Sequence, residues 1–416
     1  MLSDTKAGEI LLKLFDGESR EIGGADSSVT CASGEVRGVT VFAFAQDRAK
    51  SGGVMTKAGA EKIIKTMKKA AECGAPVVGI FDSIGANISE GAAAMAYYGD
   101  ILAAAADISG VVPFFAISDG IVSASCAVIA GAADIFIATE NAEIYITPGK
   151  NADDSADIAA IKVADLDEAF KTAAHLIAIF PQNNLGRLPD FEFDIPDFDK
   201  DDAVASLLDK ETPCFEIYKE YGTAKTVIGT ISGEIAGVVF MGKDKLACRD
   251  CQKIARFISL LDAYSIPVIT FADGGFADDI CARAIFTLSR SYSEATTVKI
   301  TVVSGGLHGV FGSVLTANNA DAVFAFPSAA ISPLAPESAV EFFYHDKLKG
   351  AGDLAKKRKE LAAEYAKNEA SPEAAAKTGV IEAIVSPEAL RTEVAYLLET
   401  LRTKRAHARP AKKHSV

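Results

Sequence analysis

Blocks of hydrophobic residues along the chain predict an alternation of helices and strands. In residues 57–73 apolar side chains recur every three or four positions, which predicts a helix with one buried face. Residues 76–82 form a short apolar run without alternating polar positions, a pattern typical of a parallel strand covered on both faces. Strands and helices that alternate in this way predict right-handed crossovers and an α/β fold.

The hydrophobic pattern occurs twice. The run Ser-Gly-Glu-Val-Arg-Gly-Val at 33–39 is repeated at 232–238 as Ser-Gly-Glu-Ile-Ala-Gly-Val. Internal similarity over such a distance indicates two copies of one domain. We place these domains at residues 1–195 and 196–416, joined by a polar, proline-containing segment within 181–199.

Each copy is expected to contain a β-rich entry, a helix, a strand, a helix, a strand and a helix of small residues. The ranges are 35–45, 57–73, 76–82, 90–106, 114–118 and 121–131 in the first copy, and 226–241, 250–263, 267–273, 279–293, 300–304 and 309–317 in the second. The turns Asp119-Gly120 and Gly305-Gly306 are predicted to precede the small-residue helices. The first turn of a helix has free backbone N–H groups, so each turn is a candidate oxyanion site. The alternative is that Gly and Ala there only permit tight packing.

Charge and composition narrow the class of function. Lys and Arg number 42 and Asp and Glu 56, and 42 − 56 = −14 is a net charge that disfavours a nucleic-acid-binding protein. The 7 scattered cysteines do not form the pattern of a secreted disulfide framework. The N-terminal residues lack the apolar core of a signal peptide, and the longest apolar stretch carries charges. We therefore expect a cytoplasmic protein without a membrane span.

Several motifs resemble those of the biotin-dependent acyl-CoA carboxyltransferases, over most of the chain. The run Asp-Ser-Ile-Gly-Ala-Asn-Ile-Ser-Glu-Gly at 82–91 resembles the family's Asp-Ser-Gly-Gly-Ala-Arg-x-x-Glu-Gly. The run Pro-Gln-Asn-Asn at 181–184 is similar to the end of the family's first domain. The most specific likeness lies at 371–387, Ser-Pro-Glu-Ala-Ala-Ala-Lys-Thr-Gly-Val-Ile-Glu-Ala-Ile-Val-Ser-Pro, which closely follows the family's C-terminal region.

This resemblance implies a fold and a reaction. The fold would be two tandem crotonase-like (β-β-α superhelix) domains, the first on the CoA side and the second on the biotin side. A carboxyl group would pass between carrier-bound biotin and an acyl-CoA, through an enolate, in an acyl-CoA carboxylase or decarboxylase. Each domain would supply one oxyanion hole made of backbone N–H groups. The resemblance implies no metal, and biotin would not be attached to this chain.

The resemblance also implies partners. These are the acyl-CoA substrate, a biotin carboxyl carrier protein, and either a biotin carboxylase or a membrane decarboxylase subunit. In the family two chains pair so that the first domain of one faces the second domain of the other, so we expect a homodimer. Stacking of dimers into a hexamer stays open, as do the acyl group and the direction of the reaction.

The family motifs assign candidate site residues by position. The catalytic N–H donors would be those of Ala124, Ser125, Gly309 and Val310. The substrate-binding residues would be Ser83, Ile84, Gly85, Ala86 and Ser123 on the CoA side, and His308, Phe311 and Gly312 on the biotin side.

Departures from the family pattern keep two alternatives open. The two glycines of the first hole are replaced by Ala124 and Ser125, and His308 takes the place of a glycine in the second. The loops that follow residues 149 and 276 are shorter than in the family. The first alternative is a degenerate, non-catalytic scaffold subunit. The second is a crotonase-type acyl-CoA enzyme that does not use biotin.

Overall fold

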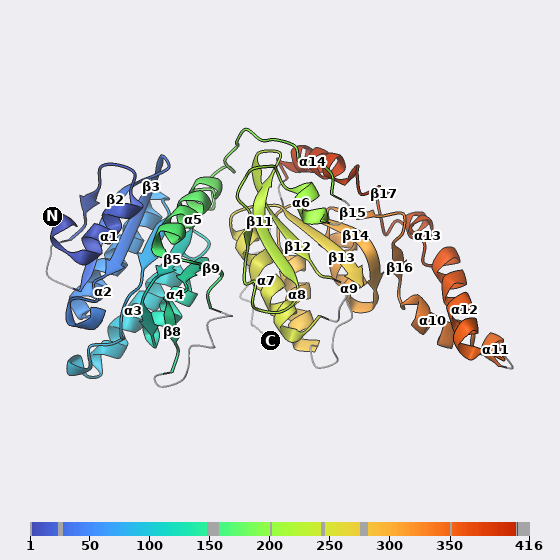
Figure 1. Ribbon diagram of the computed structural model, residues 1–416, viewed down its shortest axis with the longest axis horizontal. Coiled ribbons are helices and arrows are strands. Elements are labelled where there is room, and N and C mark those ends of the chain that lie inside the picture. Colours follow the sequence, from blue (N-terminus) through green and yellow to red (C-terminus); the bar gives the residue numbers. More distant parts are fainter. Residues whose placement is uncertain are drawn as a thin grey trace. The chain divides into compact units, whose positions relative to one another are not determined.

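The computed structural model describes residues 2–23, 28–147, 158–199, 202–242, 246–274, 282–349, 352–404 and 406. These form two compact units, drawn in Figure 1. The first consists of residues 1–189 and 217–220, and the second of residues 190–216 and 221–416. The return of 217–220 to the first unit was not indicated by the hydrophobic pattern. The short loops expected after residues 149 and 276 lie outside the described residues.

The first unit is built on a seven-stranded sheet in the order β1-β2-β3-β4-β5-β7-β9 (Figure 1). Its strands are β1 (Arg20–Glu21), β2 (Val29–Val36), β3 (Val39–Gln46), β4 (Val77–Ile80), β5 (Phe114–Ser118), β7 (Ile135–Thr139) and β9 (Ile161–Val163), with β6 (Ile121–Ser123) and β8 (Glu143–Tyr145) as a separate pair. Its helices are α1 (Lys6–Leu14), α2 (Lys57–Cys73), α3 (Ala93–Ile108), α4 (Ser125–Gly131) and α5 (Leu166–Ile179). The sheet is antiparallel from β1 to β3 and parallel from β3 to β9.

Helices cover both faces of this sheet, as its sequence pattern predicts. Every residue of β4, β5 and β7 is buried, because parallel strands with crossover helices have no solvent face. On one face α2, α3 and α4 share a single core with the strands, which includes Phe44 and Phe114. On the other face the rings of Phe115 and Phe180, the residue that ends α5, meet edge to face at 5.8 Å.

The second unit repeats this plan. Its sheet runs β10-β11-β12-β13-β14-β15-β17, antiparallel from β10 to β12 and parallel from β12 onward, with β16 added beside β14. The strands are β10 (Phe215–Glu216), β11 (Lys225–Ile231), β12 (Glu234–Phe240), β13 (Val268–Gly274), β14 (Lys299–His308), β15 (Ala322–Ala325), β16 (Ala330–Ser332) and β17 (Ala383–Ile384). The helices are α6 (Ala203–Leu207), α7 (Cys248–Ala263), α8 (Ala282–Glu294), α9 (Gly309–Leu315), α10 (Pro336–Phe343), α11 (His345–Leu348), α12 (Leu354–Asn368), α13 (Pro372–Lys377) and α14 (Leu390–Leu401).

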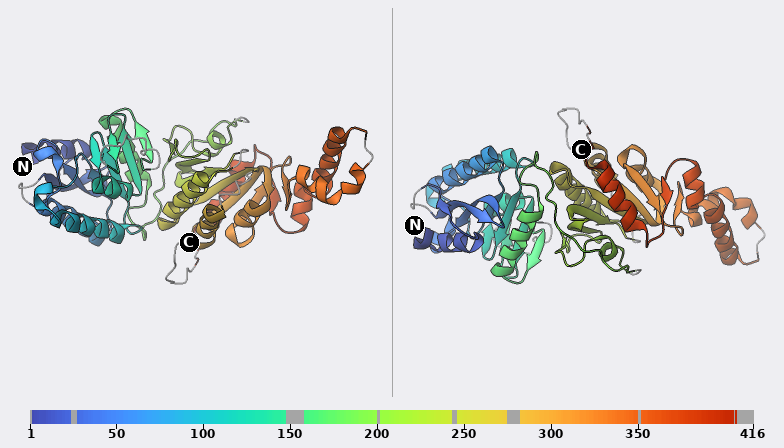
Figure 2. Two further views of the ribbon diagram at one scale, coloured as in Figure 1. Left: turned by 90° about the horizontal axis from the view of Figure 1, so that it is seen from below. Right: turned by 90° about the horizontal axis from the view of Figure 1, so that it is seen from above.

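Helices added after β16 distinguish the second unit from the first. α10 and α12 pack against each other (Figure 2). The rings of Phe343 and Tyr365 stack there with their centroids 5.9 Å apart. α14 is not one of these additions, because it follows β17 as α5 follows β9, and it packs leucine side chains onto the sheet core of this unit. The additions therefore extend the repeated plan without replacing any strand of it.

The structure confirms most predicted elements and corrects two. Helix 57–73 and strand 114–118 have the predicted bounds. The helix predicted at 121–131 is wrong in its first part, because residues 121–123 form β6 and pair with β8. The turn predicted at Gly305-Gly306 is also wrong, since β14 runs through it to His308 and pairs with β16. In both cases a parallel strand more than twenty residues later extends the β-structure, and local sequence does not reveal that partner.

Candidate functional site: two equivalent turns

A strained turn leads into α4 in the first unit. Ala124, the residue before the helix, has a φ of 53° and a ψ of −125°, a conformation that costs energy for a residue with a side chain. Its N–H donates to the carbonyl of Tyr145 at 2.6 Å. The N–H of Ala127 is the first to bond back to the turn, with the Ala124 carbonyl as its acceptor. Among the described residues, the N–H groups of Ser125 and Cys126 have no hydrogen-bond partner.

The second unit contains the same turn at the start of α9. Gly309 has a φ of 61°, and its N–H donates to the carbonyl of Pro333 at 3.2 Å. Within the described part of the chain, the N–H groups of Val310 and Phe311 have no partner. Both turns thus have a residue of positive φ whose N–H is held by a carbonyl at or just after the neighbouring parallel strand. Ala124 and Gly309 are equivalent positions of the duplicated fold.

The free N–H donors of the two turns differ in part from those named in the sequence analysis. The N–H groups of Ala124 and Gly309 are already engaged in hydrogen bonds to carbonyls. The donors that remain begin one residue later, at Ser125, the first residue of α4, and at Val310, the second residue of α9. Such N–H groups carry the partial positive charge of the helix start and favour a negatively charged oxygen.

The loop 82–86 lies beside the α4 turn. The N–H of Ser83 donates to the carbonyl of Ile121 at 2.6 Å, and Ser83 pairs with Val122 of β6. Gly85 has a φ of 117°, and its N–H donates to the Ser83 hydroxyl at 3.1 Å. Within the loop Ser83 and Gly85 are buried, whereas Ile84 and Ala86 are exposed. The structure therefore brings these four predicted residues to the edge of β6.

An unused polar atom lies between this loop and the turn. The hydroxyl oxygen of Ser123 is buried and has no hydrogen-bond partner among the described residues. A Cβ placed on Gly85 would lie 3.2 Å from that oxygen, so any side chain at this position would crowd it. A buried hydroxyl without a partner costs free energy unless a ligand or water satisfies it. Ser123 is therefore available to a polar group of a bound molecule.

Asp82 anchors the start of the same loop. Its carboxylate accepts a hydrogen bond from the N–H of Ile121 at 3.2 Å and pairs with Arg48 at 3.7 Å. Burial raises the pKa of Asp82, and that hydrogen bond and Arg48 oppose the rise. A Cβ on Gly120 would lie 2.3 Å from the Asp82 carboxylate, so only glycine fits there. Asp82 thus holds loop 82–86 against β6.

His308 fills space in the second unit. Its ring is buried, and Nδ1 lies 3.3 Å from the carbonyl oxygen of Ser332. Because a carbonyl oxygen can only accept a hydrogen bond, Nδ1 is the ring nitrogen that carries the proton. A Cβ on Gly306 would lie 3.1 Å from Nε2, which shows that the imidazole covers that glycine. Burial lowers the pKa of His308, while the hydrogen bond to the Ser332 carbonyl and the charge of Glu337 act to raise it. Burial is the larger effect, so the ring is neutral near pH 7.

The other predicted biotin-side residues differ in their exposure. Val310 is 53% exposed, whereas Phe311 is buried in the core. A Cβ on Gly312 would meet no atom closer than 4.0 Å, so there is open space beside it. Phe311 can therefore serve a ligand only through its backbone N–H, while Val310 and Gly312 lie at the surface of the turn.

Sequence reasoning missed a buried polar cluster behind the α4 turn, formed by Gln46, Tyr98 and Cys126. The Cys126 thiol lies 3.6 Å from the side-chain nitrogen of Gln46 and 3.2 Å from the Tyr98 hydroxyl. Burial raises the pKa of Cys126, which keeps it a neutral thiol. The one available signal was a glutamine that ends the apolar strand run Val-Phe-Ala-Phe-Ala-Gln at 41–46.

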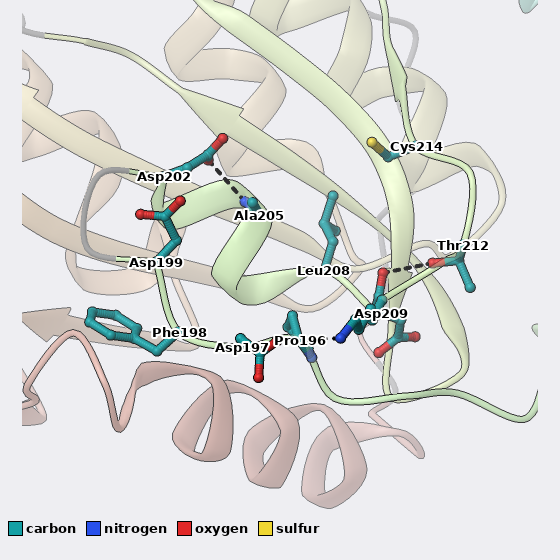
Figure 3. A pocket seen from close by; sticks show the side chains of 11 residues that line it. Pro196, Asp197, Phe198, Asp199, Asp202, Ala205, Leu208, Asp209, Thr212 and Cys214 are labelled. Atoms are coloured by element: carbon teal, nitrogen blue, oxygen red, sulfur yellow. Dashed lines mark hydrogen bonds and ion pairs between the residues drawn. The ribbon is translucent and has the colours of Figure 1, made fainter.

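The second unit also contains a cavity of about 870 Å³, which is lined by residues other than those of the α9 turn (Figure 3). Its lining includes Phe198, Leu208 and Cys214 and the carboxylates of Asp199 and Asp202, but none of the predicted site residues. Among the described residues, no group of three or more His, Cys, Asp or Glu side chains is placed to hold a metal ion. Over the same residues, no helix has the length and apolarity needed to cross a membrane.

Comparison with known proteins gives a consistent result. A family model described as "Carboxyl transferase domain" matches residues 13–152 and 159–416. The chain is 30% identical over 440 residues to the carboxyltransferase subunit of propionyl-CoA carboxylase from Haloferax mediterranei, covering 93% of this chain and 84% of that protein. It is 29% identical to the alpha subunit of methylmalonyl-CoA decarboxylase from Propionigenium modestum, covering 93% of this chain and 84% of the relative.

A solved structure agrees with these relatives. The transcarboxylase 12S structure, described as a hexamer with hydrolysed methylmalonyl-coenzyme A bound, matches with a TM-score of 0.90 and 27% identity, over 98% of this chain and 91% of that one. The duplicated α/β plan seen in Figure 1 is thus the crotonase-like fold expected from the sequence. Because the family model and the curated relatives span nearly the whole chain, this protein belongs to the carboxyl transferase domain family, the biotin-dependent acyl-CoA carboxyltransferases.

Proposed function

We propose that this chain is the carboxyltransferase subunit that moves a carboxyl group between carrier-bound biotin and an acyl-CoA. One observation carries the proposal: a member of this family has the same turn in both units, each with a free N–H on the residue that follows the strained one. Carboxyl transfer at a thioester needs such donors twice, once for each group whose oxygen gains negative charge.

The acyl-CoA side uses the first unit. Loss of the α-proton places negative charge on the thioester oxygen, and the free N–H groups of Ser125 and Cys126 are the donors suited to stabilise it. The hydroxyl of Ser123 supplies a further polar contact. The enolate carbon then forms its bond to the incoming carboxyl carbon. The carboxyl group would leave a ureido nitrogen of biotin for the enolate carbon, and the α-proton would take its place on that nitrogen, so the exchange needs no oxidant or reductant.

The biotin side uses the second unit. When bound, biotin supplies a carboxyl group on a ureido nitrogen, and negative charge falls on the ureido oxygen as that bond breaks. The N–H groups of Val310 and Phe311 are the donors suited to that oxygen, and the open space at Gly312 leaves room for a ring. Neutral His308 adds no charge to this side, because burial lowers its pKa.

The assembly is expected to be a homodimer, or a hexamer built from such dimers. Large apolar side chains are exposed on the elements that form both turns: Ile84 in loop 82–86 and Val128 in α4 of the first unit, and Val310 in α9 of the second. Exposed apolar groups concentrated at one place favour burial by another chain. The transcarboxylase 12S structure is described as a hexamer, which supports the same expectation.

Partners and substrate follow the relatives. The proteins named above act on propionyl-CoA or methylmalonyl-CoA, which differ by one carboxyl group. We assign the same pair to this chain, with a biotin carboxyl carrier protein as the donor or acceptor. A biotin carboxylase would drive carboxylation and a membrane decarboxylase subunit would drive the reverse.

The test is transfer of carboxyl from methylmalonyl-CoA or malonyl-CoA to free biotin by the purified chain. Transfer to biotin supports the proposal, and the preferred thioester identifies the substrate. Binding of the CoA esters without transfer would contradict it and favour a non-catalytic scaffold. Hydration, isomerisation or hydrolysis of an acyl-CoA that avidin does not inhibit would instead indicate a biotin-independent crotonase reaction.

A further inference from the structure

A buried amide connects the two backbone segments of the acyl-CoA side. Gln46, the last residue of β3, is 2% exposed. Its side-chain oxygen accepts a hydrogen bond from the N–H of Asp82 at 3.2 Å, where loop 82–86 begins. Its side-chain nitrogen donates to the thiol of Cys126 at 3.6 Å, just after the α4 turn. The amide therefore spans from the loop to the turn.

The thiol end of this connection is itself held in place. The Tyr98 hydroxyl lies 3.2 Å from the Cys126 sulfur, and both side chains are buried. The donor and acceptor of an amide lie in one rigid plane, so bonding both ends restricts how far apart the loop and the turn can move. Leaving either end unpaired in a buried site carries a desolvation cost, which makes the arrangement resist displacement.

The second unit lacks this connection. Ala45 pairs with Ile80 in the first sheet and Phe240 with Phe271 in the second, so the position after β12, Met241, corresponds to Gln46. The residue that corresponds to Cys126 is Phe311, and both Met241 and Phe311 are buried. Apolar packing thus suffices to hold the fold at this place. The polar pair in the first unit consequently has a role beyond stability.

We propose that Gln46 is a positioning residue for the acyl-CoA side, which sets the position of loop 82–86 relative to the α4 turn through Cys126. The inference rests on the proposed function, since it assumes that the α4 turn receives the thioester oxygen. Gln46 does not touch the substrate. By fixing the loop and the turn relative to each other, it sets the strength of the hydrogen bonds that the N–H groups of the turn donate to the thioester carbonyl.

The experiment compares Gln46→Met, Cys126→Ala and the double variant with the wild-type chain. Met is the residue that the second unit places at the equivalent position, so the substitution suits a core of this fold. The control is Thr66→Val, which removes a buried hydroxyl of the same unit that donates to the Lys62 carbonyl at 2.8 Å and also contacts the Cys31 thiol of β2. The probe is propionyl-CoA labelled with ¹³C at the thioester carbonyl, followed by infrared spectroscopy and calorimetry, alongside carboxyl transfer.

Wild type and Thr66→Val should bind the probe and shift its carbonyl band to lower frequency, because hydrogen bonds polarise the carbonyl. Gln46→Met should bind within about threefold of wild-type affinity but lose the shift, and kcat should fall about 10- to 100-fold, the size of effect expected from a small misplacement of the reacting group. Cys126→Ala should lower kcat in the same direction. The double variant should be no worse than Gln46→Met, as expected for two parts of one connection.

The results can contradict either the positioning role of Gln46 or the proposed function. A full band shift in Gln46→Met, or equal losses of kcat in Gln46→Met and Thr66→Val, would overturn the positioning role. A wild-type chain that binds the probe without any band shift would overturn it as well. A band shift in wild type, lost in Gln46→Met, with no carboxyl transfer by either, would leave the positioning role standing and reject the proposed function instead.

Discussion

The α4 turn and the α9 turn have one backbone plan and different side chains. In the first unit Ala124 adopts a positive φ and a polar pair, Gln46 and Cys126, lies behind it. In the second unit glycine takes the strained position, and Met241 and Phe311 fill the space behind. What both turns retain is the engaged N–H at the strained residue and the free N–H at the next. The comparison teaches that the free backbone donor is the common feature, while the side chains around it differ between the two units.

The largest expected effect comes from removing that donor. Proline is tolerated in the first turn of a helix and has no N–H, so Ser125→Pro and Val310→Pro should each delete one donor and keep the fold. Each should lower kcat for carboxyl transfer about 10²- to 10³-fold, as for other oxyanion donors. Steady-state kinetics with methylmalonyl-CoA and biotin measure this.

Alanine variants at the same two positions complete the comparison. Ser125→Ala and Val310→Ala keep the N–H and should lose far less activity than the proline variants. If Ser125→Pro and Ser125→Ala were equally active, the turn of the first unit would not be the donor. A loss at one turn only would show that the two units are not functionally equivalent.

Exchanging the strained residues should change stability in opposite directions. Ala124→Gly relieves a positive φ, so it should raise the free energy of unfolding by about 1 kcal/mol. Gly309→Ala introduces the same strain and should lower it by about 1 kcal/mol. Urea unfolding followed by circular dichroism measures both. Changes of the same sign at the two positions would contradict the equivalence of the turns.

The smallest expected effect is on the pH dependence of stability, and it comes from His308 in the second unit. His308 has a lowered pKa because it is buried, so the unfolded chain binds this proton more readily than the folded one. Its contribution to stability is present above about pH 6.5, the unfolded value, and is lost as the pH falls below it. His308→Gln should therefore flatten the fall in stability on the acid side. His345→Gln, at an exposed position of α11, is the control and should leave the slope unchanged.

Local pattern predicted the elements that local interactions form. The helix 57–73 was found with its bounds because Thr56 caps one end, accepting from the Gly59 N–H, and Gly74 ends the other with a φ of 63°. Strand 114–118 was found because an unbroken apolar run fits a two-sided core. Residues 121–123 and 305–308 were misassigned, since each belongs to a strand only through pairing with a distant segment.

The motifs named candidate N–H donors at both turns, and the structure shows which of these N–H groups are free. The motifs located Ser125 and Val310, and also included Ala124 and Gly309, whose N–H groups the structure engages. Those acceptors, the carbonyls of Tyr145 and Pro333, lie about twenty residues further along the chain, so spacing within the motif gave no sign of them. The roles of all these residues stay predictions until the variants are measured.

The amino-acid sequence by itself determined the duplication, the α/β class and the family, because these depend on periodicity and on motifs that are contiguous in the chain. Only the tertiary structure decided which N–H groups are free and that Gln46 reaches Cys126, 80 residues away. The physical reason is that hydrogen-bond satisfaction in a folded core depends on which distant segments are packed together.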